Sequence, residues 1–175
     1  TMSLAGTKEV DKGLEWRSKE KQEQQFVTDY ITSELRRQGI KDINIKGPYT
    51  VSAGNIEHLR SDISFDLNKK YPLDIAWGLH PTPAVNGVPK EQSTKLIKQI
   101  ELEDSRQDRS LYSGFIGLIS QTSSRLYVNL RCCELTNSNA HIYVGGGYTL
   151  QSDVDSEWEE TERKSETLTR IFDLL

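Results

Sequence analysis

Apolar side chains recur along this chain with two spacings, one helical and one alternating. Residues 14–37 place apolar side chains three or four positions apart with polar residues between them, which predicts an amphipathic helix. Gly39 is a typical residue just beyond a helix C-terminus, so we expect the helix to end there. The same spacing predicts further helices over 92–103 and 157–175.

Segments with β-branched and aromatic residues in alternation predict strands. These segments are 42–51, 58–65, 113–120, 126–135 and 141–149. The first is interrupted at Gly47-Pro48, and the turn residues 136–139 join the last two. Because helices and strands are mixed along the chain and no linker or repeat separates them, we expect an α+β fold, with residues 1–175 forming a single domain.

Two local patterns refine this outline. Residues 79–89 contain three prolines and a glycine, so we expect an ordered loop after a helical or irregular segment at 73–77. Ser156 and Glu159 have the spacing of a capping box, which places the start of the last helix near residue 157.

Composition excludes several classes of protein. The chain has 175 residues, 27% of them charged, with a net charge of −4, so a large nucleic-acid interface is not expected. No apolar run approaches the roughly 20 residues that span a bilayer, and the start does not resemble a signal peptide. Cys132 and Cys133 are adjacent, which excludes a disulfide framework and favours packing roles. We expect a cytoplasmic protein without a membrane partner.

The last predicted helix carries candidate ligand-binding residues. Glu157, Glu160 and Lys164 are spaced to lie on one helix face, although such a stripe is more often simply solvated. The glycines at 145–147 lie just upstream, where consecutive N–H groups can bind an anion; a bulge or tight turn is the alternative.

Other candidates lie apart from this helix. Glu23 stands three residues after Glu20, and Glu23 and Glu160 can share a Mg²⁺ ion if their helices meet. Arg131 is expected within a strand, where a buried guanidinium would bind the carboxylate of a ligand. The alternatives are that Glu134 pairs with Arg131 or that the strand is an exposed edge. His80 lies in the proline-rich loop.

A set of short motifs in order along the chain resembles the isochorismate synthases of the chorismate-utilising enzyme family. The motifs are Ala5-Gly6-Thr7, Lys19 to Val27, Leu79-His80-Pro81-Thr82-Pro83-Ala84, Tyr112 to Gly117, Leu130-Arg131-Cys132, Gly145-Gly146-Gly147, and Ser152 with Glu157-Trp158-Glu159-Glu160-Thr161 and Lys164. The resemblance covers essentially the whole chain and implies antiparallel sheets with outer helices, as part of a two-layer fold.

The resemblance also implies roles for individual residues. Glu23 and Glu160, helped by Glu157, would hold Mg²⁺, which anchors the ring carboxylate of chorismate. Substrate-binding roles would fall to Gly6, Thr7, His80, Ala84, Val85, Tyr112, Arg131, Gly145, Gly146, Gly147 and Lys164. Within this group, Arg131, Tyr112 and the glycine amides would bind the enolpyruvyl carboxylate, with Lys164 nearby as a countercharge.

The proline-rich motif is similar to that of isochorismate synthases, which favours water as the nucleophile over the ammonia of anthranilate synthases or the chemistry of salicylate synthases. The product would feed menaquinone or siderophore biosynthesis. A non-catalytic anion-binding or interaction domain on the same scaffold is the alternative from another class.

The chain also departs from the family pattern. Gly146 and Cys133 stand where alanine is usual, and either Arg106 or Arg109 matches the family arginine. The family's general base lysine and general acid glutamate lie before the Ala-Gly-Thr turn. We therefore expect a carboxyl-terminal portion that is inactive alone and has the amino-terminal half of the enzyme as its partner.

Overall fold

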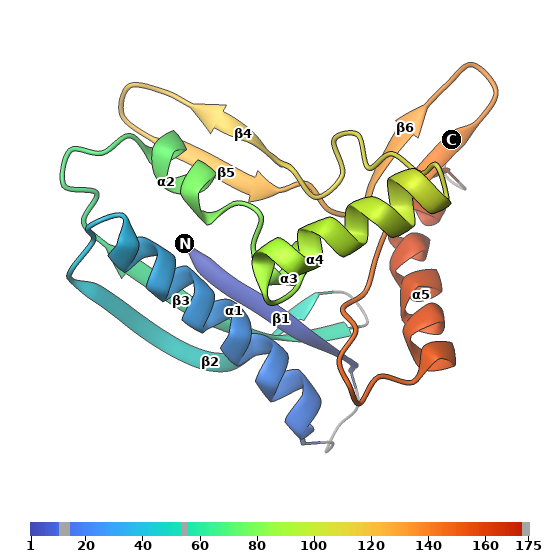
Figure 1. Cartoon of the computed structure of the whole chain (residues 1–175), viewed down its shortest axis with the longest axis horizontal. Helices are drawn as coiled ribbons and strands as arrows, with labels where there is room; N and C mark the ends of the chain where they lie inside the picture. Colours follow the sequence, from blue (N-terminus) through green and yellow to red (C-terminus); the bar gives the residue numbers. More distant parts are fainter. Residues whose placement is uncertain (11–14, 54–55, 173–175) are drawn as a thin grey trace. The chain divides into compact units, whose positions relative to one another are not determined.

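The computed structural model describes residues 1–10, 15–53 and 56–172 (Figure 1). It divides the chain into two compact units, Thr1–Lys95 and Leu96–Leu175. Both units combine helices with antiparallel strands, which confirms the α+β prediction. That residues 1–175 form a single domain stays a prediction.

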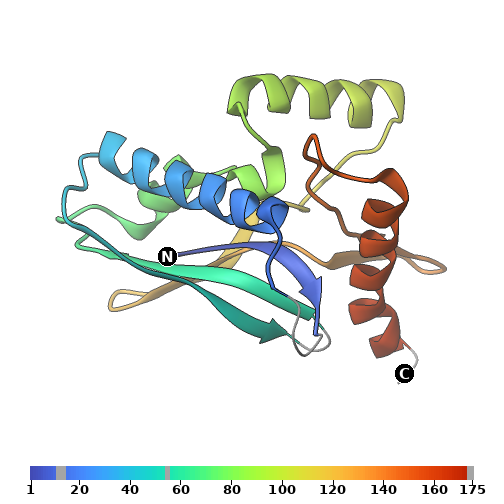
Figure 2. The same ribbon diagram turned by 90° about the horizontal axis from the view of Figure 1, so that it is seen from below.

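The first unit is built on a three-stranded antiparallel sheet in the order β1-β3-β2. Its strands are β1 (Met2–Glu9), β2 (Ile43–Ala53) and β3 (Ile56–Phe65). Helix α1 (Ser18–Arg37) lies across one face of this sheet (Figure 2). The predicted helix and both predicted strands of this unit are thereby confirmed, although the helix begins at Ser18 and residues 15–17 lie before it. Position 14 lies outside the described residues.

The core of the first unit follows from the helical spacing in α1. Val27, Ile31 and Leu35 are four residues apart, so they lie on one stripe, and all three are buried. They pack with Ile63 of β3 and with apolar residues of helix α2 (Pro72–Leu79). Packing of this stripe against the sheet supplies the hydrophobic stabilisation of the unit.

A buried polar network joins α1 to β1 and β3. The Gln24 side chain accepts a hydrogen bond from the amide of Ala5 at 2.9 Å and donates to the hydroxyls of Ser3 at 2.8 Å and Ser61 at 3.1 Å. Because Gln24 is only 2% exposed, these bonds satisfy polar groups that would otherwise be buried unpaired. They fix the rotation of α1 over the sheet.

Two irregularities shape the sheet. The pairing of β2 with β3 shifts between Lys46 and Tyr49, which is the interruption expected at Gly47-Pro48. A second shift, between Ala5 and Thr7, places Gly6 at a bulge in β1 with φ 70°. The alternation rules did not predict β1 itself, because a turn-like glycine interrupts its short pattern.

The proline-rich segment is more helical than predicted. Helix α2 continues through Leu79, and a single turn, α3 (Pro83–Asn86), follows it. The expectation of a loop throughout 79–89 is wrong because Pro83 occupies the first turn of α3, where its missing N–H has no intrahelical partner to lose. Helix α4 (Lys90–Ile97) then passes into the π-helical segment η1 (Lys98–Asp104), close to the predicted helix 92–103.

The second unit contains two separate hairpins and a long helix. Strand β4 (Phe115–Ile119) pairs with β5 (Ser124–Val128), and β6 (Cys132–Leu135) pairs with β7 (Ala140–Tyr143). The single strand predicted over 126–135 is wrong. Arg131 has φ 51°, in the left-handed region, and this conformation breaks the pleat between β5 and β6.

Helix α5 (Val154–Phe172) begins earlier than the capping box predicted. Asp153, not Ser156, caps it, because the Asp153 carboxylate accepts hydrogen bonds from the Ser156 amide at 3.0 Å and from the Ser156 hydroxyl at 2.8 Å. These hydrogen bonds, the amide's first, lower the pKa of Asp153. The predicted end of the helix at 173–175 lies outside the described residues.

The two units differ in how they bury apolar side chains. Among the described residues, every buried hydrophobic side chain belongs to the first unit. In β4 of the second unit, Leu118 is 79% exposed and Ile116 is 64% exposed. Over the described ranges, no helix combines the length and apolar character needed to cross a bilayer.

Candidate functional site

The second unit brings several predicted site residues together around the end of β7. Lys164 of α5 donates a hydrogen bond from Nζ to the carbonyl oxygen of Gly145 at 3.0 Å, and the same ammonium lies 2.6 Å from the carboxylate of Glu160. Both side chains of this ion pair are largely shielded from solvent. We call Tyr112, Gly145, Glu157, Glu160 and Lys164 the glycine-strand cluster.

Close packing accounts for the first of the three glycines. A Cβ atom added to Gly145 would lie 2.6 Å from the hydroxyl oxygen of Tyr112, whereas one on Gly146 would lie 3.5 Å from a carboxylate oxygen of Glu157. A Cβ on Gly147 would meet no atom within 4 Å. None of the three has a positive φ, so a tight turn does not explain them. Gly145 is required for the approach of Tyr112.

Glu157 does not belong to a solvated stripe. It is 2% exposed on a helix where the next residue, Trp158, is 65% exposed. A carboxylate is rarely buried without a partner or ligand, since removal from water disfavours its charged form. The sequence pattern indicated the shared face of this helix but not which carboxylate is buried.

Tyr112 is held by its neighbours as well as by Gly145. Its ring stacks on the ring of Tyr143 with centroids 5.9 Å apart, and the Arg109 guanidinium lies 5.8 Å from the Tyr112 ring centroid. Burial raises the pKa of Tyr112, and Arg109 opposes this rise. The hydroxyl therefore stays protonated at neutral pH and is available as a hydrogen-bond donor.

The structure separates the two arginines that sequence spacing left open. Arg109 forms a bidentate ion pair with Glu101 of η1, with N–O distances of 2.5 and 2.7 Å. Arg106 is exposed and has φ 54°. Arg109 is thus the arginine that packs beside Tyr112.

Arg131 lies in the break between β5 and β6 and is half-buried. Glu134 was one expected partner, but Arg131 forms no ion pair with any residue of the described ranges. The Glu134 carboxylate instead accepts a hydrogen bond from the Tyr143 hydroxyl at 3.4 Å.

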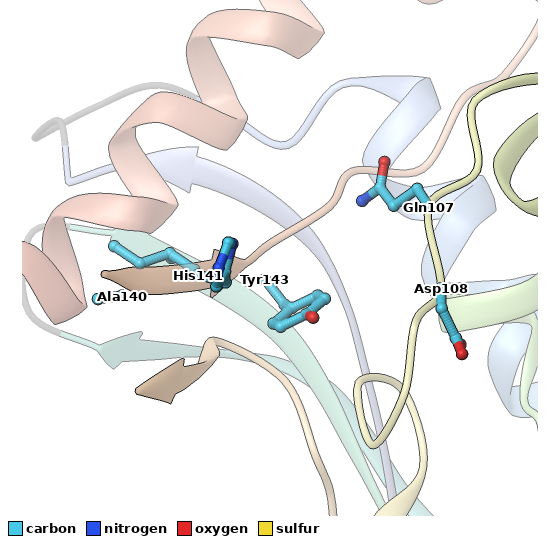
Figure 3. Close-up of a pocket in the computed structure, with 6 residues that line it drawn as sticks. Gln107, Asp108, Ala140, His141 and Tyr143 are labelled. Atoms are coloured by element: carbon cyan, nitrogen blue, oxygen red, sulfur yellow. The ribbon is translucent and has the colours of Figure 1, made fainter. Parts of the chain in front are cut away.

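An open hollow of about 460 Å³ lies beside Tyr143 (Figure 3). It is lined by Gln107, Asp108, Ala140, His141, Ile142 and Tyr143. None of the predicted site residues lines it, and its lining is mostly polar. It is a surface depression of the second unit and does not coincide with the glycine-strand cluster.

The first unit brings together the predicted residues Gly6 and Thr7 with a histidine that the sequence did not single out. His58 is 8% exposed, and its Nδ1 atom lies 3.2 Å both from the carbonyl oxygen of Gly6 and from the hydroxyl of Thr7. Register explains this contact, since Thr7 pairs with His58 across β1 and β3. The strand pattern at 58–65 would have placed the histidine, but pairing with the unpredicted β1 could not be foreseen.

The two carboxylates near the start of α1 differ in environment. Glu20 is 3% exposed, packs against Gly6 and accepts hydrogen bonds from Arg17. Burial, the largest influence, pushes the pKa of Glu20 upward. The hydrogen bonds from Arg17 and from the Glu20 backbone amide, together with the charges of Arg17 and Lys19, jointly outweigh burial, so the net pKa lies below its ordinary value. Glu23 is half-buried, with a carboxylate oxygen 3.8 Å from the ammonium of Lys19. The buried member of the pair is therefore Glu20.

His80 follows α2, and a lysine holds its backbone in place. Lys90 donates hydrogen bonds from Nζ to the His80 carbonyl oxygen and to the Tyr30 hydroxyl, both at 2.9 Å. Burial, followed by the charge of Lys90, lowers the pKa of His80, so its imidazole is neutral at pH 7. On α3, Val85 is half-buried and Ala84 is exposed.

The carboxylates predicted to bind metal are distributed over both units. Glu23 belongs to the first, and Glu157 and Glu160 belong to the second. In the described part of the chain, no three or more His, Cys, Asp or Glu side chains are placed to hold a metal ion. The donor types alone suit a hard cation, since all three are carboxylates.

The chain belongs to the family of chorismate binding enzymes, whose pattern matches residues 3–173. It is similar to the isochorismate synthase MenF of Haemophilus influenzae, with 28% identity over 183 residues that cover 98% of this chain and 41% of that protein. It is also 28% identical to the isochorismate synthase EntC of Escherichia coli K12, over 89% of this chain and 39% of that protein.

A solved structure has the same fold. DhbC of Bacillus anthracis, a proposed 2,3-dihydroxybenzoate-specific isochorismate synthase, superposes with a TM-score of 0.82 at 21% identity, covering 100% of this chain and 49% of that chain. The predicted resemblance and fold class are confirmed by these matches. This chain spans about two-fifths of the length of the two curated relatives.

Proposed function

We propose that this chain is the substrate-binding portion of a Mg²⁺-dependent isochorismate synthase, an isomerase that adds water at one ring carbon of chorismate as hydroxide leaves another. The observation that carries the proposal is the family match over residues 3–173, together with relatives named as isochorismate synthases. The motif Leu79 to Ala84 supports water as the nucleophile. The product would enter menaquinone or siderophore biosynthesis in the cytoplasm.

The glycine-strand cluster suits one end of a dianionic substrate. Tyr112 offers a neutral hydroxyl donor, Lys164 offers a cation, and the backbone at 145–147 offers amide donors. Arg131, half-buried and without an ion-pair partner among the described residues, would bind a carboxylate bidentately. Hydrogen-bond donors that are already in place around the negative charge that develops in a transition state are usually the largest single source of catalytic stabilisation.

The first unit would supply the contacts to the ring. Gly6 and Thr7 are held at the β1 bulge by His58 and Glu20, so their backbone position is fixed before a ligand arrives. His80, Ala84 and Val85 would line the ring, and the neutral imidazole of His80 suits an uncharged surface.

Mg²⁺ is proposed as the cofactor, with Glu23, Glu157 and Glu160 as its carboxylate ligands. When bound, the ion would neutralise the ring carboxylate of chorismate. Lys164 now pairs with Glu160, and a cation at that carboxylate would free the ammonium to act on the substrate. Carboxylate oxygens are the ligands that Mg²⁺ prefers in proteins.

The isolated 175-residue chain is proposed to be inactive, because the family's general base lysine and general acid glutamate would lie in the part of the relatives that this chain does not match. Each such group is worth about 10²–10⁴-fold in rate. The partner that completes the enzyme would be the amino-terminal half present in the relatives.

Calorimetry tests the binding part of this proposal. We expect the 175-residue chain to bind chorismate with Mg²⁺ present and more weakly without it. Glu160→Gln should weaken the Mg²⁺-dependent binding. Glu159→Gln is the matched control, since that carboxylate is 70% exposed on the same helix. No chorismate binding under either condition would refute the assignment of the substrate-binding residues to this chain.

Product analysis tests the reaction. We expect no isochorismate from the chain alone, and isochorismate from EntC in which this chain replaces the matching segment. Isochorismate formation by the chain alone would overturn the predicted inactivity. Salicylate, or anthranilate in the presence of ammonia, would change the reaction class.

A further inference from the structure

An ion pair and an aromatic ring come together in the segment between η1 and β4. Arg109 pairs bidentately with Glu101, and both side chains are mostly shielded, at 26% and 28% exposed. The same guanidinium lies over the Tyr112 ring and donates from its third nitrogen, Nη1, to the Ser113 hydroxyl at 3.4 Å. One arginine thus contacts Tyr112, a predicted ligand-binding residue, together with Glu101 and Ser113.

The local backbone explains how Glu101 reaches Arg109. Glu101 lies in the π-helical segment η1, whose wider turn redirects side chains relative to an α-helix, and π-helical turns are frequent at functional sites. Just beyond the end of η1, the Gln107 amide donates a hydrogen bond to the Glu101 carbonyl oxygen at 2.6 Å. The bidentate fork of arginine matches the carboxylate, so the pair has one defined geometry.

Tyr112 has little freedom once this pair is formed. Arg109 contacts its ring, Tyr143 stacks on the ring, and the hydroxyl rests against the backbone of Gly145. A cation over an aromatic ring is worth about 0.5–2 kcal/mol, depending on how well it is desolvated, which corresponds to about 2- to 30-fold in an equilibrium. Loss of the guanidinium therefore allows the ring to leave this position.

We propose that Glu101 and Arg109 are positioning residues that hold the Tyr112 ring so that its hydroxyl faces the backbone at Gly145 and donates to a carboxylate group of the ligand. Neither residue touches the ligand in this assignment. The inference rests on the proposed function for the identity of that ligand, but the placement of Tyr112 is testable without it.

The first test reads the ring directly. In the 175-residue chain labelled with ¹³C at its tyrosine rings, Tyr112→Phe assigns the Tyr112 signals. We expect Arg109→Gln and Glu101→Gln to abolish the ring contact between Tyr112 and Tyr143. Arg106→Gln, an exposed arginine nearby, is the matched control and should leave the contact unchanged.

A charge reversal separates positioning from simple stabilisation. The double variant Glu101→Arg/Arg109→Glu restores an ion pair but places a carboxylate, not a guanidinium, beside Tyr112. We expect it to recover most of the melting temperature lost by the single variants, about 2–4 °C, while the ring contact stays lost. Recovery of both the melting temperature and the ring contact would overturn the proposal, because the pair would then act only as a structural brace.

Chorismate binding by the same chain supplies the functional reading. With Mg²⁺ present, Arg109→Gln and the charge reversal should weaken binding about three- to tenfold, and Arg106→Gln should not. If the wild-type chain binds no chorismate, the proposed function fails while the ring measurement still decides the positioning role. Unchanged ring contacts in Arg109→Gln would overturn the positioning role whatever the chain binds.

Discussion

Replacing Gly145 by alanine tests the close approach of Tyr112 to the backbone. The new Cβ atom would lie 2.6 Å from the Tyr112 hydroxyl oxygen, against 3.4 Å for an ordinary contact, so atoms must move by about 0.8 Å. The hydroxyl is the end of a side chain, which eases the shift, but Arg109 and Tyr143 hold the ring. We expect Gly145→Ala to destabilise the chain by about 1–2 kcal/mol, within the range for overpacked sites.

The assay is urea unfolding followed by circular dichroism, with stability taken from the midpoint and slope. Gly147→Ala is the matched control, because its Cβ would meet no atom within 4 Å, and we expect a change within about 0.5 kcal/mol. Tyr112→Phe removes the hydroxyl. In a double-mutant cycle, Gly145→Ala should therefore cost at least about 1 kcal/mol less in the Tyr112→Phe chain than in the wild type.

Two results would refute this reasoning. Equal effects of alanine at Gly145 and Gly147 would show that the hydroxyl does not rest on Gly145. A full cost of Gly145→Ala in the Tyr112→Phe background would show that something other than the hydroxyl limits the space.

Three further predictions concern the first unit, and the first of them has its control in the second unit. Leu35→Ala, at a fully buried position, should cost about 2–5 kcal/mol in urea unfolding, while Leu118→Ala, at a 79% exposed position, should cost less than about 0.5 kcal/mol. Gln24→Leu should cost about 1–3 kcal/mol, because it leaves the Ala5 amide and the buried Ser61 hydroxyl without this partner, and a neutral result would contradict the polar network. The pKa of Glu20 is lower in the folded chain than in the unfolded chain, so the Glu20 carboxylate stabilises the fold above its ordinary pKa of 4.5. This stabilisation is lost as the pH falls below that value. Glu20→Gln should therefore flatten that part of the acid-unfolding curve, and an unchanged curve would contradict the assigned pKa direction.

Periodicity predicted the elements whose signals are long and local. The stripe of Val27, Ile31 and Leu35 identified α1, and the interruption at Gly47-Pro48 was visible because both residue types are rare inside strands. The helix around Glu157 was predicted with the help of a local capping signal at its start.

The failures have a common physical origin in single-residue backbone conformations. An arginine does not indicate a left-handed backbone conformation, so the φ of 51° at Arg131 was not predicted. One long strand was therefore predicted where two short strands occur. Pro83 looked like a helix breaker, although it is well suited to the first turn of α3. Asp153 and Ser156 are both good caps, and the choice between them depends on how the chain enters the helix.

The candidate site was predicted by residue type more fully than by contact. The sequence pointed to Gly145, Glu160 and Lys164, which the structure brings together. It did not reveal that Glu101 pairs with Arg109, because that contact depends on a π-helical turn with no signature in spacing. His58 was likewise missed, because its role depends on strand register.

The uneven distribution of buried apolar side chains, all of them within Thr1–Lys95 among the described residues, has a consequence for how the molecule opens. Amides of α1 and β3 should exchange with deuterium most slowly, at rates set by global unfolding. The amides of the hairpins β4–β5 and β6–β7 should exchange through local openings of lower free energy, since a two-stranded hairpin is only marginally stable by itself. Tyr112 and Gly145 therefore belong to the unit with the lower free energy of local opening. A bound anion would raise the protection of amides from exchange most in that unit.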